Sequence, residues 1–289
     1  LCFTWNNMKL NKDIFLYSAE DKLVTNKKFN IYSDLKTNIA WTDIKNEKDL
    51  SKYYNSDKYD SFKNKPKVLL DYIYFFIQRL MLRYKWSIVK KLAPNNIKSL
   101  DVGSGLGVYA EFCLKRGVRQ SIVENNLKAL EICNNKGLKT FASINKIPND
   151  CKFKIITFWH SLEHMINLNE ILNKCNSLID QDGFLVIAVP NINSFDSKHY
   201  KERWAALDVP RHLWHFTRKG IESLLIKKDF LLIESYPLFF DVFYIAYITE
   251  KQNGSFFPFF KGLLIGIISN IKALFSKEHS SIIYVFKKN

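Results

Sequence analysis

The sequence predicts an α/β fold in which a seven-stranded, mostly parallel sheet has helices on both faces. From residue 97 onward, short apolar runs alternate with segments of helical periodicity, and a glycine-rich turn joins the first run to the first helix. The expected strands are residues 97–102, 120–123, 139–142, 154–159, 184–189, 230–235 and 281–286. The expected helices are residues 110–116, 127–134, 168–179 and 217–228. A polar turn at residues 181–183 should precede the fifth strand, and Pro190 should end it.

Three regions are expected along the chain. Residues 1–60 form an N-terminal extension, residues 61–96 a helical cap, and residues 97–289 the main domain. Two long insertions in that domain, 191–216 and 237–279, follow the carboxyl ends of strands and are expected to act as lids over a site. The cap is expected to be an amphipathic helix whose aromatic residues are buried, because apolar residues recur at helical spacing. These residues are Leu69, Ile73, Phe76, Leu80 and Tyr84.

The chain is strongly basic, with a formal net charge of +15 from 43 basic and 28 acidic residues. Such a charge suits nucleic acid, an anionic membrane or an acidic substrate. Residues 61–98 interleave basic and aromatic residues, which is also the composition of a nucleic-acid surface. The helical spacing favours an amphipathic helix with a basic solvated face, and a nucleic-acid partner stays as an alternative.

Targeting signals and cysteine usage predict a cytoplasmic protein. The first residues lack a charged n-region and a sustained apolar core, and the five cysteines form no CxxC pair. The apolar segment around residues 256–275 is interrupted by Lys261 and Lys272, so it is too short and too charged to span a bilayer. It is expected to cover the site or to rest on anionic lipid at the inner membrane face. The oligomeric state stays open.

The glycine-rich turn LDVGSGLG, residues 100–107, predicts a nucleotide-type ligand. Glycine lets backbone N–H groups approach a ligand at a strand-to-helix turn. A dinucleotide fingerprint would need glycine at position 108, where this chain has Val108. The pattern is instead D-x-G-x-G-x-G, followed about 20 residues later by Glu124 at the end of the next apolar run, as expected for an acid that holds ribose hydroxyls.

Ionisable residues gather at two further places. His160, Glu163 and His164 follow the fourth strand, where burying them without a partner or ligand would be costly. The first insertion adds Arg211 and His212 within WAALDVPRHLWHF. For the insertion, a binding lid and a structural pair between Arg211 and a nearby aspartate are equally good interpretations.

Four segments together resemble class I S-adenosylmethionine (SAM)-dependent methyltransferases, and in particular a bacterial group related in motif layout to the ubiquinone-pathway O-methyltransferases. The segments are LDVGSGLGVYAEF, FWHSLEHM, FLVIAVPN and WAALDVPRHLWHFT. The resemblance extends over almost the whole chain, including residues 53–59 and 280–285. It implies a Rossmann-like fold, SAM as cofactor and S-adenosylhomocysteine (SAH) as product.

The resemblance also implies which residues hold the cofactor and act on the acceptor. The implied cofactor residues are Asp101, Gly103, Ser104, Gly105, Gly107, Tyr109, Glu124, Asn125, Ser143, Ile144, Trp159 and His160. The candidate catalytic residues are His164, His212 and Arg211. Methyl transfer needs mainly positioning of the acceptor, and a histidine adds general-base help when the acceptor is a hydroxyl.

No metal ligand is predicted. Members of this group carry a cysteine-rich knuckle, but residues 29–44 contain no cysteine, so no zinc site is expected. Some quinone O-methyltransferases hold a divalent cation with a Glu-x-x-Glu-His arrangement. This chain has His160-x-x-Glu163-His164, in which the first ligand differs, and the use of a divalent metal stays open.

The expected function is methyl transfer from SAM to a small-molecule acceptor, at oxygen or nitrogen. One alternative is a nucleic-acid methyltransferase. The fourth strand lacks the Asn/Asp-Pro-Pro-aromatic signature of amino-group methylation, and the chain has no Pro-Cys dipeptide. The other alternative is an enzyme at the membrane surface that acts on a lipid-like or quinone-like acceptor.

Overall fold

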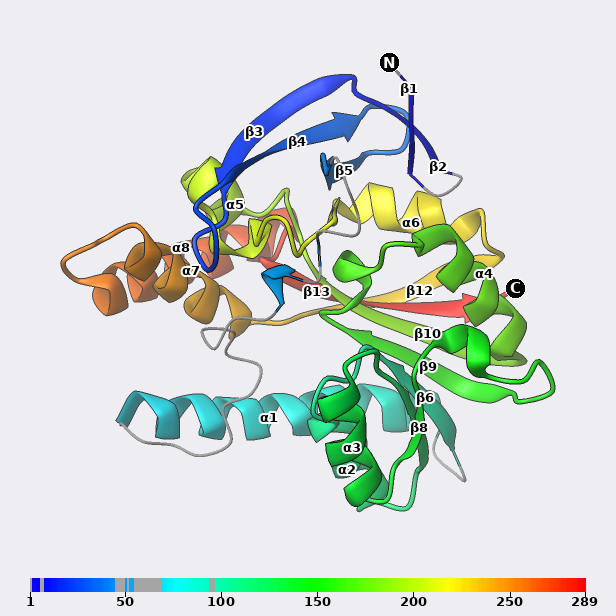
Figure 1. Cartoon of the computed structure of the whole chain (residues 1–289). Coiled ribbons are helices and arrows are strands. Elements are labelled where there is room, and N and C mark those ends of the chain that lie inside the picture. Colours follow the sequence, from blue (N-terminus) through cyan, green and yellow to red (C-terminus); the bar gives the residue numbers. More distant parts are fainter. Residues whose placement is uncertain (1, 6–7, 45–49, 51, 55–68, 94–96) are drawn as a thin grey trace.

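The computed structural model describes the chain except residues 1, 6–7, 45–49, 51, 55–68 and 94–96, and except the side chains of residues 2–9 and 69–74. Its centre is a seven-stranded sheet in the order β12-β13-β10-β9-β6-β7-β8 (Figure 1). The strands are β6 (Lys98–Val102), β7 (Arg119–Val123), β8 (Lys139–Phe141), β9 (Phe153–Trp159), β10 (Ile179–Pro190), β12 (Phe230–Pro237) and β13 (Ser281–Lys288). Only β13 runs antiparallel to its neighbours in this sheet. The predicted mostly parallel sheet is confirmed.

Helices cover both faces of this sheet, and alternate residues of one strand show the two layers. Leu185 and Ile187 of β10 pack in the same cluster as residues of α4 and α6. Val186 and Ala188 pack in the cluster that holds residues of α1 and α2. The helices are α1 (Leu69–Leu92), α2 (Val108–Leu114), α3 (Leu127–Asn135), α4 (Leu168–Leu178) and α6 (Arg218–Ile226). A strand buried on both faces reads as an almost continuous apolar run, which is the pattern that the sequence displayed.

The turn predicted at residues 181–183 is wrong, because these residues lie inside β10. Ile179 pairs with Phe153 and Phe184 with Ile155, so the register shifts between the two pairs. Extra residues on one strand are absorbed as an irregularity of the ladder. The polar residues that suggested a turn therefore mark a bulged segment of the strand.

Helix α1 packs on the domain through its C-terminal half. Ile88 and Val89 are buried, and Met81 and Leu82 pack against the same cluster. Phe76, expected on the buried face, is 64% exposed, because the helix extends beyond the edge of the sheet (Figure 1). The predicted burial is therefore wrong at Phe76. The side chains of Leu69 and Ile73 lie outside the described residues.

The N-terminal region contributes strands where the sequence predicted only an extension. It supplies β3 (Ile14–Glu20), β4 (Lys28–Asp34) and β5 (Ile39–Thr42) to a second, antiparallel sheet, beside the β1 (Cys2–Trp5) and β2 (Met8–Asn11) hairpin. The fourth strand of this sheet is β11 (Trp214–Phe216), which comes from the insertion at residues 191–216. The extension and the insertion are thus one structural unit.

The two insertions are tied together by a buried carboxylate. The first contains α5 (Phe195–Tyr200), and the second folds into a helical hairpin of α7 (Asp241–Gln252) and α8 (Pro258–Ser276). Asp196 of α5 is fully buried and accepts hydrogen bonds from Trp204 Nε1 (2.8 Å), Ser269 Oγ (2.9 Å) and Ser280 Oγ (2.6 Å). A buried carboxylate with all its partners present fixes α8 against the first insertion.

Candidate active site

The glycine-rich turn lies at the carboxyl end of β6, between β7 and β9. This is the switch point of the sheet, where ligands bind in open α/β folds. Gly103, Gly105 and Gly107 all have positive φ, which favours glycine. A Cβ on Gly103 would lie 2.5 Å from Ser161 Cβ, and one on Gly107 would lie 2.7 Å from Cys133 Sγ. A Cβ on Gly105 would meet no described atom within 4 Å, so this part of the turn has room for a ligand.

Glu124 follows β7 and lies against that open part of the turn. Its Oε2 accepts a hydrogen bond from the Gly105 N–H (2.8 Å) and its Oε1 one from the Asn126 N–H (2.9 Å). Each carboxylate oxygen has a second lone pair, which can accept a hydrogen bond from a ligand hydroxyl. The structure therefore holds Glu124 where the sequence placed the ribose-binding acid, with Asn125 exposed beside it.

Asp101, the second-last residue of β6, is buried and accepts a hydrogen bond from Thr157 Oγ1 (2.7 Å). Burial raises its pKa to about 6, although the hydrogen bond and Lys85 act in the opposite direction. Lys85 of α1 has its Nζ 4.7 Å from the centre of the Trp159 ring. Burial lowers the pKa of Lys85, whereas Asp241 and Asp101 favour its charged form. The sequence analysis missed this cation, because nothing separates it from the other basic residues of the segment.

The remaining predicted cofactor residues lie at neighbouring strand ends. Trp159, at the end of β9, makes an edge contact with the Tyr109 ring, whose centre is 5.0 Å away. Ser143 begins a short 3₁₀ helix after β8, and its Oγ accepts from the Asn145 N–H (3.3 Å). The Ile144 side chain is in the hydrophobic core, which leaves only its backbone for an adenine. Ser104 lies within the turn itself.

His160 connects the cofactor side of the site to α7. It has a φ of 53°, a left-handed conformation that is uncommon for a side chain of this size. Its Nε2 lies 2.8 Å from Asp241 Oδ2, and its Nδ1 lies 3.6 Å from Glu163 Oε1. Burial acts to lower the pKa of His160, but the two carboxylates raise it to about 9. At neutral pH this imidazole is therefore a cation.

Next to it, Glu163, His164 and His212 bring their ligand atoms within 4.8 Å of one another. Glu163 is 1% exposed, and neither carboxylate oxygen has a hydrogen-bond partner among the described residues. The Nδ1 of His164 lies 3.0 Å from the Arg211 carbonyl oxygen, and that of His212 lies 2.8 Å from the Ala206 carbonyl oxygen. A carbonyl only accepts, so each Nδ1 carries a proton, and in the neutral form of each ring Nε2 keeps its lone pair.

The charges in this cluster suit either a base or a metal site. Burial and the neighbouring His212 lower the pKa of His164 to about 4, so its imidazole is neutral. Burial acts to raise the pKa of Glu163, but the three surrounding histidines lower it, so its carboxylate is ionised. Two imidazoles, each with its Nδ1 on a backbone carbonyl, and one ionised carboxylate are a donor set that fits a divalent cation. The sequence analysis left a divalent metal open, because His160 differs from the first ligand of the Glu-x-x-Glu-His arrangement. It did not show that His212 joins Glu163 and His164, since His212 lies far from them in the chain.

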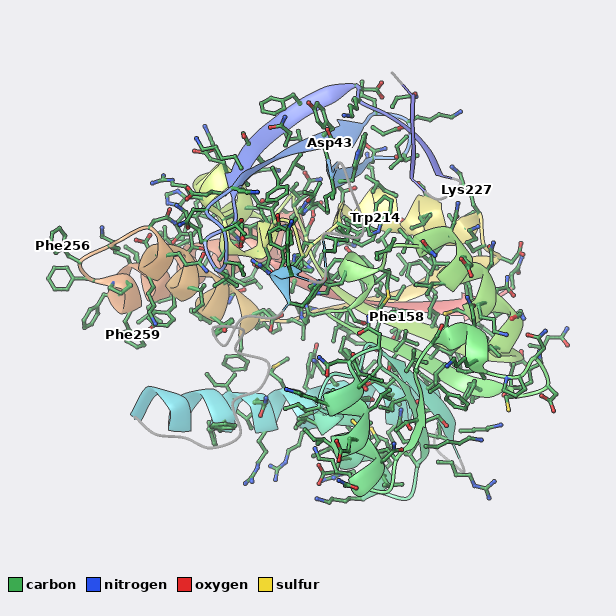
Figure 2. The ribbon with its side chains drawn as sticks, in the orientation of Figure 1. Asp43, Phe158, Trp214, Lys227, Phe256 and Phe259 are labelled. Carbon is green, nitrogen blue, oxygen red and sulfur yellow. The ribbon has the colours of Figure 1, made fainter. Side chains whose placement is uncertain are left out.

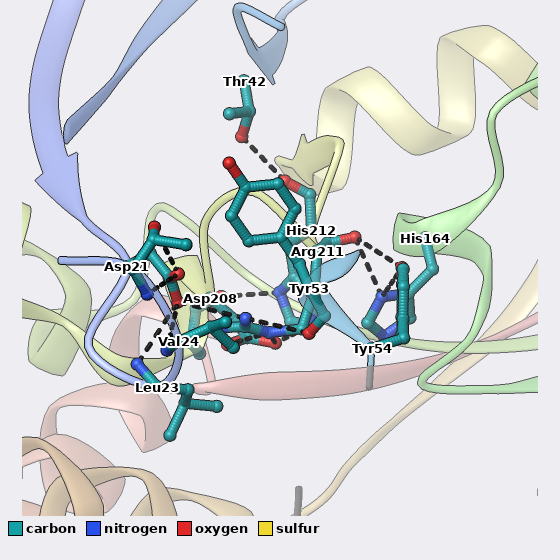
Figure 3. A network of polar contacts seen from close by, with 12 residues as sticks. Asp21, Leu23, Val24, Thr42, Tyr53, Tyr54, His164, Asp208, Arg211 and His212 are labelled. Carbon is teal, nitrogen blue, oxygen red and sulfur yellow. Dashed lines mark hydrogen bonds and ion pairs between the residues drawn. The ribbon is translucent and has the colours of Figure 1, made fainter. Parts of the chain in front are cut away.

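Arg211 is buried and does not face the cluster with its guanidinium (Figure 3). Its Nη2 lies 2.7 Å from Asp208 Oδ1, and its Nη1 lies 3.1 Å from Asp21 Oδ1 and 3.4 Å from the Tyr53 carbonyl oxygen. These bonds favour a positioning role, which was one of the two interpretations of this residue. Tyr54 OH contacts the Arg211 carbonyl and His164 Nδ1, both at 3.3 Å. The rest of the segment 53–59, residues 55–59, lies outside the described residues.

A separate cavity of about 270 Å³ lies on the other side of this ion pair. Residues of β3, of the turn after it and of the first insertion line it, including Lys22, Glu202, Asp208 and Arg211. None of the predicted cofactor residues contributes to its wall. The cavity is thus distinct from the switch point, where the ligand-binding geometry is found.

The sequence model of the methyltransferase-domain family matches residues 76–235, which is more than half of the chain. The matched part contains the glycine-rich turn and the whole histidine cluster. The chain belongs to this family. It is a SAM-dependent methyltransferase, as the sequence predicted.

Solved structures share its fold. Magnesium protoporphyrin IX methyltransferase from Synechocystis PCC 6803 with bound SAH has a TM-score of 0.55 at 10% identity, covering 84% of this chain and 100% of that chain. The same enzyme with bound SAM gives 0.51 at 11% identity, with 84% and 96% covered. 1,6-Didemethyltoxoflavin-N1-methyltransferase from Burkholderia thailandensis gives 0.48 at 12% identity, with 78% and 93% covered. No curated protein sequence matches this chain.

The residues of this methyltransferase fit SAM. Gly105 leaves open space beside the Glu124 carboxylate, which can accept hydrogen bonds. Trp159 and His160 lie at the end of the adjoining strand, β9. The assignment of individual cofactor and catalytic residues stays a prediction.

Glu124→Gln should weaken SAH binding at least about tenfold, because hydrogen bonds to a charged acceptor contribute about 1.5–3 kcal/mol each. The glutamine keeps the shape and one acceptor oxygen. Titration calorimetry measures the change, with Glu131→Gln on the exposed face of α3 as the matched control. If the two variants bound SAH with equal affinity, the prediction that Glu124 contacts the cofactor would be wrong.

Arg211→Met should destabilise the methyltransferase by about 3–5 kcal/mol, because it leaves the buried Asp21 carboxylate without its cation. Urea unfolding measures this change. Arg119→Met provides the control, since Arg119 is exposed at the start of β7. A loss no larger than the control's would show that the ion pair does not hold the insertion.

Stability should be highest near pH 6.5–7. The folded-state pKa of His160, about 9, lies above the unfolded value of 6.5, so its contribution is complete below pH 6.5 and disappears as the pH rises through 9. His164 and His215, with pKa values lowered to about 4 and about 3, act oppositely and destabilise the fold below pH 6.5. Urea unfolding at several pH values measures the free energy of unfolding on the acidic and on the alkaline side of this maximum. Asp241→Asn should flatten the alkaline limb alone, and an unchanged alkaline slope would refute the assignment.

Proposed function

We propose that this methyltransferase transfers the methyl group of SAM to a small-molecule acceptor, at an oxygen or nitrogen atom. The observation that supports this most is the contact between the glycine-rich turn and the segment after β9 that carries Glu163 and His164. Ser161 Oγ donates to the Val102 carbonyl (2.6 Å), and Gly103 approaches Ser161 closely. A cofactor held by the glycine-rich turn would therefore lie next to the segment that carries Glu163 and His164.

In this proposal the chain's own residues orient the acceptor and take up its proton. Positioning the nucleophile in line with the methyl group provides most of the acceleration. The Nε2 of His164, whose imidazole is neutral, or the Nε2 of His212 accepts the proton of an acceptor hydroxyl. The ionised Glu163 stabilises the imidazolium that forms, since its Oε1 lies 4.0 Å from His212 Nε2.

The same cluster offers a second way to activate the acceptor. Glu163, His164 and His212 would hold a divalent cation, and such a cation lowers the pKa of a bound hydroxyl. The orphaned oxygens of Glu163 favour a bound positive group at this place. The base and the cation are alternatives that one experiment separates.

A small acceptor is also consistent with related proteins. The solved structure with a TM-score of 0.55 is named for a porphyrin acceptor. The ubiquinone-pathway subgroup and a quinone-like acceptor stay part of the proposal. We also propose a cytoplasmic location, supported by three buried cysteines outside any disulfide, Cys113, Cys133 and Cys175.

Incubation with SAM that is radiolabelled in its methyl group, and with fractionated cell extract, tests the acceptor class. Label should enter the low-mass organic fraction, and His164→Ala should reduce the incorporation at least about hundredfold, the usual contribution of general acid–base catalysis. His199→Ala, outside the cluster, is the matched control. Label in DNA or RNA would assign the nucleic-acid alternative instead.

A chelator arm of the same experiment distinguishes the base from the cation. Incorporation that survives EDTA assigns the general base. Incorporation that is lost with EDTA and restored by Mn²⁺ assigns the cation.

A further inference from the structure

Helix α8 exposes its large apolar residues. Its exposed side carries Phe260, Leu263, Leu264, Ile267, Ile271, Leu274 and Phe275, which we call the apolar face. At about 100° per residue these seven positions fill one continuous arc of the helix, with no charged residue among them. Phe256 and Phe257, just before the helix, are 94% and 65% exposed. Figure 2 shows Phe256 and Phe259 pointing away from the rest of the molecule.

The opposite side of α8 is made of small residues. Gly262, Gly266, Ser269 and Ala273 are the buried positions of the helix. A Cβ on Gly262 would lie 2.7 Å from the Tyr247 backbone nitrogen, so α7 and α8 approach closely. A helix on the surface of a soluble domain normally turns its large apolar residues inward. Here the polarity is inverted, and close packing through small residues is the way helices associate in lipid.

The charge around the apolar face has one sign. From residue 251 to residue 277 the chain carries Lys251, Lys261, Lys272 and Lys277 and no acidic residue. Lys261 and Lys272 are eleven positions apart, so they lie within about 20° of each other on the helix, at one border of the apolar face. Lys272 Nζ lies 4.0 Å from the centre of the Phe195 ring of α5, so of these two lysines Lys261 is the one best placed to bring its ammonium group to lipid phosphates.

The helix lies along the domain and does not leave it. By length and composition α8 could cross a membrane. However, Ser269 Oγ donates to the buried Asp196, and Asn270 Nδ2 donates to the Phe239 carbonyl (3.0 Å). The first bond holds the middle of α8 against the first insertion, and the second holds it against the residues that precede α7, so only one side of the helix is available to lipid.

We propose that the α7–α8 hairpin docks this methyltransferase on an anionic lipid bilayer, with α8 parallel to the surface and its apolar face in the acyl–headgroup boundary. The inverted polarity provides the apolar contact, and the four lysines provide attraction to anionic headgroups. Asp241, the first residue of α7, bonds to His160, so the docking hairpin forms part of the active-site wall. The inference does not depend on the acceptor class, and methyl transfer stands if docking fails.

Flotation with vesicles tests the proposal on the full chain. With phosphatidylcholine vesicles containing 30% phosphatidylglycerol the protein should float with the lipid, and pure phosphatidylcholine should bind it more weakly. The double variant Leu264→Gln, Ile267→Gln should lower the partition coefficient at least about tenfold, because two apolar side chains no longer enter the bilayer. Lys261→Ala should lower it about fivefold on the anionic vesicles alone.

The matched control is the double variant Leu35→Gln, Leu231→Gln, which changes two exposed leucines outside the hairpin. It should float like the wild type. Circular dichroism and SAH affinity establish that each variant is folded. The proposal is overturned if the wild type stays in the lipid-free fraction, or if the control loses binding equally. It is also overturned if light scattering without lipid shows a dimer that the Leu264→Gln, Ile267→Gln variant dissociates, which would assign the apolar face to a second copy of the chain.

Discussion

The buried guanidinium of Arg211 is the contact on which the acceptor side of the site depends. It joins Asp208 of the first insertion to Asp21 of the N-terminal sheet. Asp21 also accepts hydrogen bonds from backbone N–H groups in its own turn, the closest from Thr25 (2.8 Å). A buried charge is tolerated only when it is paired and hydrogen-bonded, so the insertion and the N-terminal sheet have to fold against each other. The backbone that carries Arg211 also carries His212.

The position of His212 follows from this packing. Thr42 Oγ1 donates to the His212 carbonyl (2.7 Å), and the Leu213 N–H donates to the Glu163 carbonyl (2.8 Å). The first bond reaches the N-terminal sheet and the second reaches the segment after β9. Because both bonds are buried, the His212 ring is directed at Glu163 by structure that lies outside the central sheet. The histidine cluster is therefore assembled from three separate parts of the chain.

The cofactor side is simpler, because one strand and its turn provide most of it. Gly103 and Gly107 are needed for protein packing, and Gly105 leaves space for the ligand. The hairpin of α7 and α8 then closes the arrangement, since Asp241 pairs with His160 and Ser269 pairs with Asp196. Polar and charged groups therefore couple the two insertions to each other and the second insertion to His160.

The sequence by itself determined the central sheet, the glycine-rich turn and the place of Glu124, because each depends on periodicity or spacing over a few tens of residues. Only the tertiary structure decided the N-terminal sheet, the role of Arg211, the cation at Lys85 and the meeting of His212 with Glu163. Arg211 and Asp21 are 190 residues apart in the chain, and no local pattern encodes such a pair. The tertiary structure also decided that Phe76 is exposed and that residues 181–183 continue a strand. Spacing fixes which residues share a face, whereas the neighbour that covers the face is set by packing across the whole molecule.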